Sequence, residues 1–289
     1  MEIGIHTENF HDGQASFEQR QAMRQEGYTR MRQAGFTCAD LSVICNTKGI
    51  YYTADLETAK EMARAECAAA AAAGIRIHQV HGPWPTDDTT AENRKEKIGF
   101  MERAIRLTPA FGARYLVIHS DMPLGWWKED EALAWQTNTA LLRAILPIAE
   151  EEGVTICIEN MPMTALAISR TKRMYEFVQE INHPNLGMCL DTGHANVFGD
   201  DCGDMVRLIA PVLKVLHVHD NLGDKDAHLP PYQGTINWES FTAALRETGF
   251  NGVLSIEASL DVRNMQEDGH AEAARRMAEI ARKLADAAS

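Results

Sequence analysis

The sequence predicts an α/β protein, a single (β/α)8 TIM barrel in which residues 1–289 form one domain. Short apolar runs alternate eight times with longer segments that have helical periodicity. Glycines close several of the helical segments, and an apolar run follows each of them at once. Most of the apolar runs end in His, Glu or Asp. In a closed parallel barrel these endings converge on one face, which is where such barrels carry their active sites.

The eight apolar runs are the predicted strands of the barrel. The stretch MCLDTGHANVFG, residues 188–199, shows the pattern clearly, because an apolar run passes directly into Asp191 and His194. The same change from apolar to charged or imidazole side chains recurs at the ends of four further runs. The predicted strands are residues 2–6, 37–44, 75–81, 114–120, 154–160, 186–191, 214–220 and 253–257.

Between the strands lie segments whose apolar residues recur with the spacing of a helix that packs one face on a sheet. The predicted helices are residues 16–34, 55–73, 89–111, 130–152, 171–182, 201–210, 237–248 and 269–287. Four of them are followed by a glycine suited to a left-handed helix end, at Gly35, Gly74, Gly153 and Gly249. An open doubly wound sheet is the alternative arrangement, but no G-x-G-x-x-G motif follows the first strand.

The composition is that of a globular protein, with 45% hydrophobic and 24% charged residues. A formal charge of −13, from 28 Lys plus Arg against 41 Asp plus Glu, supplies no basic field for the phosphates of a nucleic acid. The six cysteines include no C-x-x-C pair. No apolar run approaches the ~20 residues of a membrane span, and no basic region precedes an apolar one at the N-terminus. We therefore expect a cytoplasmic protein with no nucleic-acid or membrane partner.

The last four predicted strands end in residues that are expected to surround one small volume: Glu159, Asp191, His217 and Glu257. Three carboxylates and an imidazole form a hard, oxygen-rich set that suits one divalent metal ion, Mn²⁺, Co²⁺, Mg²⁺ or Zn²⁺. Without a cation, like charges a few ångströms apart would repel one another. The alternative is that each acid is separately solvated or caps the following helix. His219 lies on the same strand face as His217, so the residue pattern leaves open which of them is a ligand.

Further polar and aromatic residues lie at or just past the strand ends. The imidazoles expected to contact a substrate are His6, His81, His119, His194 and His228. A histidine in such a place is more often a hydrogen-bonding group than a metal ligand. The aromatic rings in the loops of this face either stack on a small molecule or anchor their loops, and they are Trp84, Trp126, Trp127 and Phe198. Trp84 is the preferred substrate contact, whereas Trp238 is expected to pack in the core.

The motifs HGP, VIHS, IEN, CLDTGHAN, HVHDN, DAHLPPYQGTINW and SIE occur in this order along nearly the whole chain. Together they resemble the xylose-isomerase-like barrel superfamily, which contains sugar isomerases and epimerases and also endonuclease IV. The resemblance implies a metal bound by Glu159, Asp191, His217 and Glu257, and it favours His217 over His219 as the ligand. It also implies a small carbohydrate substrate, and barrels of this type commonly pair as homo-oligomers.

The endonuclease branch of this superfamily uses three zinc ions held by nine ligands. This sequence has a matching residue at every one of those places: His81, His119, Glu159, Asp191, His194, His217, Asp226, His228 and Glu257. That branch is also expected to carry basic and intercalating loops for damaged DNA. The loops here are acidic or neutral, as in WPTDDTTAEN and NVFGDDCGD. The charge therefore favours an isomerase over a nuclease.

Ketose 3-epimerases of the superfamily are expected to have a second acid six residues after the strand-five glutamate and an arginine six residues after the strand-seven histidine. Here those positions are Ala165 and Gly223. The sequence therefore looks closer to the broader isomerases, epimerases and inositol-catabolism relatives than to a free-ketose 3-epimerase. No Gly-rich phosphate loop is present, which favours a free polyol, keto-sugar or sugar acid over a sugar phosphate.

Glu159 and Glu257 are the expected catalytic residues, because they lie on opposite walls of the predicted barrel mouth. A carboxylate there can remove a proton from a carbon beside a carbonyl and return it to the same or a neighbouring carbon. A divalent metal stabilises the enediolate that forms. We therefore predict a metal-dependent isomerase or epimerase. The alternatives are an endonuclease IV-like phosphodiesterase and a metal-dependent lyase or dehydratase on the same barrel.

Overall fold

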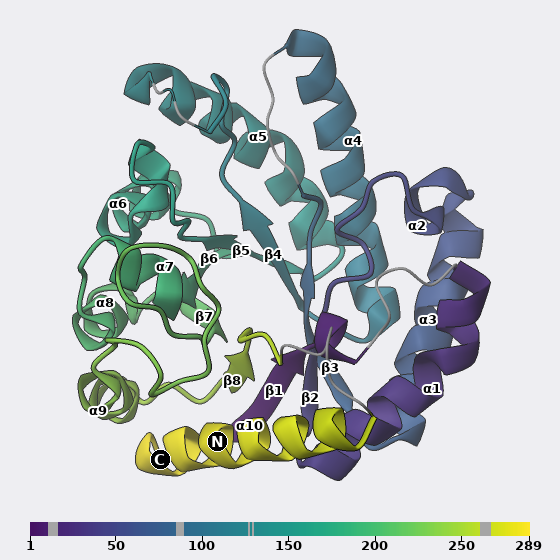
Figure 1. Cartoon of the computed structure of the whole chain (residues 1–289). Coiled ribbons are helices and arrows are strands. Elements are labelled where there is room, and N and C mark those ends of the chain that lie inside the picture. Colours follow the sequence, from purple (N-terminus) through teal and green to yellow (C-terminus); the bar gives the residue numbers. More distant parts are fainter. Residues whose placement is uncertain (11–16, 85–89, 127, 129, 261–266) are drawn as a thin grey trace.

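Eight parallel strands form the centre of the molecule in the computed structural model (Figure 1), which describes residues 1–10, 17–84, 90–126, 128, 130–260 and 267–289. Neighbouring strands pair in the order β7-β6-β5-β4-β3-β2-β1-β8. Each strand thus lies beside its neighbours in sequence, and the predicted (β/α)8 barrel is confirmed. The strands are β1 (Glu2–His6), β2 (Cys38–Leu41), β3 (Arg76–His81), β4 (Tyr115–His119), β5 (Thr155–Glu159), β6 (Leu186–Asp191), β7 (Leu213–His217) and β8 (Val253–Ile256).

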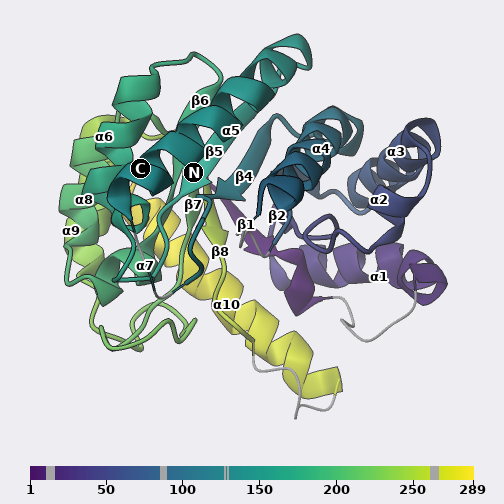
Figure 2. The same ribbon diagram turned by 90° about the horizontal axis from the view of Figure 1, so that it is seen from above.

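Helices surround the strands, as the view from above shows (Figure 2). The longer ones are α1 (Phe17–Ala34), α3 (Leu56–Ala72), α4 (Ala91–Leu107), α5 (Glu131–Glu151), α6 (Thr171–Ile181), α8 (Cys202–Ile209), α9 (Trp238–Thr248) and α10 (Glu267–Ala287). The connections also hold α2 (Ile50–Thr53), α7 (Thr192–Val197) and the 3-10 turns η1 (Thr7–Asn9), η2 (Thr108–Phe111) and η3 (Ala167–Ser169). In the described part of the chain, no helix combines the length and apolar character that crossing a bilayer needs.

The interior of the barrel determines which side chains reach the site. A small apolar cluster is made by Val117, Cys157, Cys189 and Val215, one from each of β4 to β7. Side chains two residues apart on a strand point to the same side. The residues two positions further along these strands therefore also point into the barrel, at its carboxyl end: His119, Glu159, Asp191 and His217. A much larger apolar cluster packs the helices onto the strands.

The barrel closes between β7 and β8 through a short seam. The ladder there is a single bridge between Val218 and Ile256. Val218 N donates to the Ser255 carbonyl at 2.8 Å, and Glu257 N donates to the Val218 carbonyl at 3.1 Å. His217 and Glu257 border this seam, so the closure of the barrel brings these two side chains together.

Several predicted boundaries differ from the structure. β2 ends at Leu41 because the chain turns at once, with Cys45 N donating to the Ser42 carbonyl at 3.0 Å. β7 ends at His217, beyond which only isolated bridges continue. The predicted helix 89–111 ends as an α-helix at Leu107, since Pro109 cannot donate a backbone hydrogen bond and the chain continues as η2. The predicted helix starts at residues 16 and 89 lie outside the described residues.

The predicted helix ends at glycine are confirmed. Each of the four glycines has a positive φ, between 65° and 116°, at Gly35, Gly74, Gly153 and Gly249. Two short α-helices of the described residues were not predicted, α2 and α7, and α7 begins directly after β6. It forms because the Asp191 side chain accepts a hydrogen bond from His194 N at 2.6 Å and so caps the helix.

Candidate metal centre

The predicted metal ligands come together at the carboxyl ends of β5, β6, β7 and β8. One ligand atom from each of Glu159, Asp191, His217 and Glu257 lies within 4.8 Å of the other three. His217 Nδ1 is 3.0 Å from Glu159 Oε1 and 2.8 Å from Glu257 Oε2. Among the described residues, no aligned hydrogen bond reaches the buried Glu257 Oε2, although His217 Nδ1 lies close to it. Three carboxylates and an imidazole this close together suit a divalent metal.

The carboxylates and the imidazole of this group shift one another's pKa values toward the charged forms. Burial alone would raise the pKa of Glu159, but the charge of His217 and hydrogen bonds from His119 and His217 hold that pKa well below its usual range. Glu257 is similar: burial opposes its ionisation, and His217 lowers its pKa. Burial would lower the pKa of His217, whereas Cys189 and the surrounding carboxylates raise it well above its ordinary value. Both glutamates are therefore ionised around neutral pH.

His81 and His119 adjoin the other oxygen of Glu159. Their Nε2 atoms lie 3.6 and 3.0 Å from Glu159 Oε2. Burial lowers the pKa of His119 to about 4, so this imidazole is neutral. Cys45 Sγ lies 3.5 Å from His81 Nδ1 on the opposite side of the ring. The His6 ring is further out, with its centroid 6.2 Å from that of His81.

A second group of side chains lies beside the first. Asp226 Oδ2 is 3.2 Å from His194 Nε2 and 3.1 Å from His228 Nε2. Ligand atoms of these three residues and of His219 all lie within 4.8 Å of one another. Burial would lower the pKa of His194 and of His228, but the neighbouring carboxylates raise these pKa values to about 10 and about 9. The predicted substrate residues His194 and His228 thus face one carboxylate.

The structure separates His217 from His219. His217 lies among the carboxylates of the first group, whereas His219 Nε2 bonds to Asp191 Oδ2 at 2.9 Å and belongs to the second group. The His219 ring stacks on the His228 ring at a centroid distance of 4.1 Å. Gly193 makes room for it, since a Cβ there would lie 2.0 Å from His219 Cε1.

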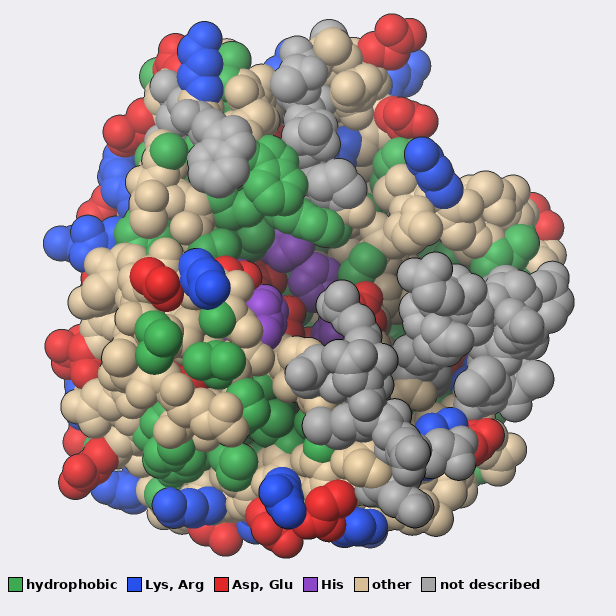
Figure 3. Space-filling view, viewed as in Figure 1, with side chains coloured by type: hydrophobic (Ala, Val, Ile, Leu, Met, Phe, Trp, Pro, Cys, Tyr) green, Lys and Arg blue, Asp and Glu red, His purple; other side chains and the backbone are tan. Residues whose placement is uncertain are grey.

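An apolar wall borders the histidines. Figure 3 shows hydrophobic side chains next to a hollow at whose base histidines are visible. The cluster consists of Met122, Met161, Met163 and Leu166, with Trp84 and Trp126 packed against it. The Trp84 ring meets the His119 ring edge-on at 4.4 Å and the Trp126 ring at 5.2 Å.

The other predicted aromatic residues have different positions. Phe198 lies under the Arg170 guanidinium at 5.9 Å. Trp127 lies outside the described residues. Trp238 is buried, as predicted, and its indole N–H donates to Asp220 Oδ2 at 3.0 Å.

Two buried residues near the first group were not predicted. Asp40 on β2 places Oδ2 3.0 Å from His217 Nε2. Asn160 uses its side chain to bond both the N–H and the carbonyl of Asp191, at 2.8 and 2.9 Å. An aspartate inside the apolar run 37–44 is the sequence signal that could have identified Asp40.

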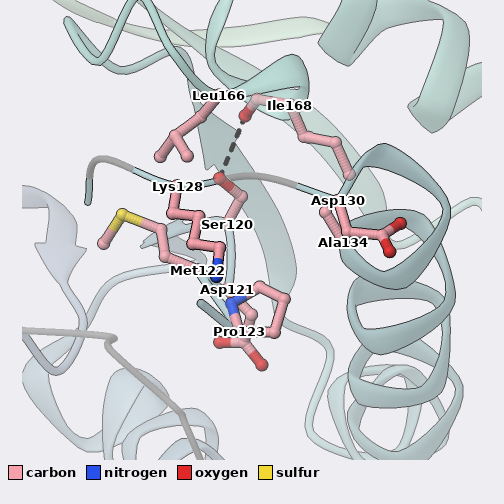
Figure 4. A pocket seen from close by; sticks show the side chains of 9 residues that line it. All are labelled: Ser120, Asp121, Met122, Pro123, Lys128, Asp130, Ala134, Leu166 and Ile168. Carbon is pink, nitrogen blue, oxygen red and sulfur yellow. Dashed lines mark hydrogen bonds between the residues drawn. The ribbon is translucent and has the colours of Figure 1, made fainter. Parts of the chain in front are cut away.

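A small side pocket adjoins the apolar wall (Figure 4). It has about 10 Å³ of free volume, which is room for no more than about one water molecule. Ser120 donates to the Ile168 carbonyl at 2.9 Å across it. The pocket is lined by Ser120, Asp121, Met122, Pro123, Lys128, Asp130, Ala134, Leu166 and Ile168. It is too small to hold a molecule much larger than water.

Known proteins resemble this chain over most of its length. A sequence model described as the xylose isomerase-like TIM barrel matches residues 28–282. An uncharacterized protein of Methanocaldococcus jannaschii is 31% identical over 184 residues, 62% of this chain and 63% of that protein. The D-psicose 3-epimerase of Ruminiclostridium cellulolyticum is 25% identical over 191 residues, 64% of each chain. The chain thus covers less than two thirds of the length of these two relatives.

Two further relatives and a solved structure extend the comparison. The inosose isomerase of Bacillus subtilis is 27% identical over 129 residues, 42% of this chain and 46% of that protein. The probable endonuclease 4 of Mycoplasma mobile is 26% identical over 188 residues, 60% of this chain and 65% of that protein. A crystal structure of D-psicose 3-epimerase in the presence of D-fructose has a TM-score of 0.77 at 19% identity, covering 98% of this chain and 99% of that chain. At that identity the likeness concerns the fold alone.

Proposed function

Because the chain belongs to the xylose isomerase-like TIM barrel family, we propose that it is a divalent-metal-dependent isomerase or epimerase of a small carbohydrate. The observation that carries this proposal is the group Glu159, Asp191, His217 and Glu257, whose ligand atoms lie within 4.8 Å of one another. The sugar epimerases and inosose isomerases among its relatives support the same class of reaction. The proposed step moves a proton at a carbon next to a carbonyl group.

These four residues would hold one divalent ion, Mn²⁺, Co²⁺, Mg²⁺ or Zn²⁺. When bound, the ion would polarise the substrate carbonyl and the adjacent hydroxyl and so stabilise an enediolate. The oxygen-rich donor set supports this assignment.

Glu257 and Glu159 are the proposed acid and base. The charge of His217 and the hydrogen bonds to the two carboxylates together outweigh burial and hold both pKa values below their usual range, so each carboxylate is ionised near neutral pH and free to accept a proton. Glu257 has 15% of its side chain exposed, against 1% for Glu159. We therefore assign the proton abstraction to Glu257, the more accessible of the two, which then carries that proton and can return it to the neighbouring carbon. Glu159, which is also ionised, would have to take a proton from a substrate hydroxyl before it could return one on the opposite face.

The remaining polar residues are proposed to hold the substrate. Its hydroxyl groups would bond to the imidazoles of the hollow, His6, His81, His119, His194 and His228. An apolar C–H face of the substrate would lie against Trp84, which already contacts the His119 ring at 4.4 Å. The methionines behind Trp84 keep water from that side of the hollow.

A metal-dependent phosphodiesterase is the second candidate, because the Asp226 group adjoins the first group of ligands. All nine residues that match the endonuclease ligands lie in these two groups or directly beside Glu159. The charge of −13 argues against a nucleic-acid substrate. The two candidates differ in the number of metal ions that each chain should bind.

The proposal is tested by the metal content of the purified protein, measured by elemental mass spectrometry. We expect about one divalent ion per chain in the wild type and none in the double variant Glu159→Gln/Glu257→Gln. Glu66→Gln is the matched control, because Glu66 is a buried carboxylate that pairs with Arg24 at 2.6 Å, far from the strand ends. Keto-sugars and inososes would then be screened for exchange of a carbon-bound proton with D₂O by NMR.

Each outcome separates the candidates. One ion per chain together with metal-dependent proton exchange supports the isomerase. Three zinc ions per chain and cleavage of DNA with abasic sites would favour the phosphodiesterase. A protein that binds no divalent metal even after soaking contradicts both.

A further inference from the structure

Asp40 is a buried carboxylate in the middle of the barrel wall. It lies on β2, only 1% of its surface is exposed, and the residues on either side of it are apolar. Its Oδ2 atom accepts a hydrogen bond from Gln79 Nε2 at 2.8 Å. Burying a charged group costs free energy unless it is paired, so this position requires a partner.

That partner is His217, the imidazole of the first ligand group. Asp40 Oδ2 lies 3.0 Å from His217 Nε2. No aligned hydrogen bond to Nε2 is formed among the described residues. At this distance the contact is an ion pair when the imidazole is protonated. The other ring nitrogen, Nδ1, faces Glu159 and Glu257.

The two sides of the His217 ring therefore have different partners. We propose that Asp40 is a positioning residue: it keeps a proton on His217 Nε2, so that Nδ1, which bonds to Glu159 Oε1 at 3.0 Å, is the nitrogen that would give up its proton and bind a metal ion. This inference rests on the proposed metal-dependent function. An imidazole that donates its second N–H to a carboxylate is fixed in tautomer and orientation and becomes a more basic ligand.

Gln79 completes the arrangement from the next strand. Its amide donates to the same Asp40 oxygen that faces His217. β2 and β3 are neighbours, with Asp40 opposite Gln79 in the pairing, so the amide reaches the carboxylate directly. Gln79 therefore keeps Asp40 from turning away from the imidazole.

The test is the affinity of the full-length protein for Mn²⁺, measured by isothermal titration calorimetry at one pH. Asp40→Asn keeps the size of the side chain and removes its charge. We expect it to weaken Mn²⁺ binding about 10- to 100-fold, the usual effect of losing a residue that supports a metal ligand. The control Glu66→Gln also loses the charge of a buried carboxylate and is expected to bind Mn²⁺ as the wild type does.

A second readout reports on the imidazole itself. In ¹H–¹⁵N NMR spectra of the Zn²⁺-loaded protein, the Nε2–H proton of His217 should resonate at low field in the wild type, because a carboxylate accepts from it, and should move upfield in the Asp40→Asn variant. If Asp40→Asn does not fold, Gln79→Met replaces it, because it releases Asp40 without removing its charge and should weaken Mn²⁺ binding in the same direction.

The outcomes distinguish this inference from the proposed function. If the wild type binds Mn²⁺ and Asp40→Asn binds it equally well with an unchanged Nε2–H chemical shift, the positioning role is wrong and the metal site stands. If Glu66→Gln weakens binding as much as Asp40→Asn, the effect is one of general stability and the inference also fails. If the wild type binds no metal, the inference and the proposed function fail together.

Discussion

At Gly193 the space left by a missing side chain is filled by the ring of His219. A Cβ at this position would lie 2.0 Å from His219 Cε1, far inside van der Waals contact. His219 in turn bonds to Asp191, one of the proposed metal ligands. Because Gly193 has no side chain, the His219 imidazole can lie beside it and bond to Asp191, which holds this proposed ligand in place.

We expect Gly193→Ala to lower the free energy of unfolding by about 1–3 kcal/mol, because the ring or the helix must move. It should also weaken metal binding, since the bond from His219 to Asp191 is lost. Gly99→Ala in α4 is the control, because a Cβ there meets nothing within 4 Å and alanine favours a helix by about 0.5–1 kcal/mol. Urea denaturation measures the free energy of unfolding of both variants. If Gly193→Ala is as stable as Gly99→Ala, the space beside Gly193 is not needed for the His219 ring.

At the same scale, the sequence predicts the members of the site better than their roles. Glu159, Asp191 and Glu257 could be grouped because all end strands of one parallel barrel. His217 and His219 could not be separated from the residue pattern, since both lie on one strand face. Asp40 was not predicted, because its role depends on a contact across the barrel from β2 to β7.

Among the elements, α5 begins at a defined cap. The Asp130 side chain accepts a hydrogen bond from Leu133 N at 3.0 Å, as the predicted helix 130–152 implies. We expect Asp130→Ala to lower the free energy of unfolding by about 1 kcal/mol, because a helix amide is left without its partner. Asp130→Ser retains a capping oxygen and should restore most of the loss. Thermal denaturation of the two variants checks this, and an alanine variant as stable as the serine variant would contradict it.

Element positions could be predicted where periodicity extends over several turns. The longer helices match the predicted ranges to within a few residues, and the glycine helix ends were correctly placed. α7 was missed because six residues are too few to show a periodic pattern. It depends instead on the Asp191 side chain, which caps the helix and also belongs to the ligand group.

For the molecule as a whole, the alternation of strands and helices was sufficient to predict the barrel. Each strand pairs with its neighbours in sequence. The strand order of the barrel can therefore be predicted from the alternation of strands and helices alone. The join between the last two strands is different. β1 pairs with β8 over four residues, whereas β7 meets β8 only through the bridge of Val218 and Ile256.

At that seam a bound metal ion would cross-link two strands of the barrel wall. A cation bound by His217 from one side and Glu257 from the other would join two strands that few backbone bonds connect. Without metal, we expect the Val218 and Glu257 amides to exchange with D₂O faster than amides of the β5–β6 ladder, because the seam opens locally. Saturating Mn²⁺ should slow that exchange, because opening the seam would separate two ligands, and at 100 times the dissociation constant it should raise the free energy of unfolding by about 2.7 kcal/mol. If Mn²⁺ leaves the exchange of the Val218 and Glu257 amides unchanged, the occupant of this site does not govern how readily the barrel opens.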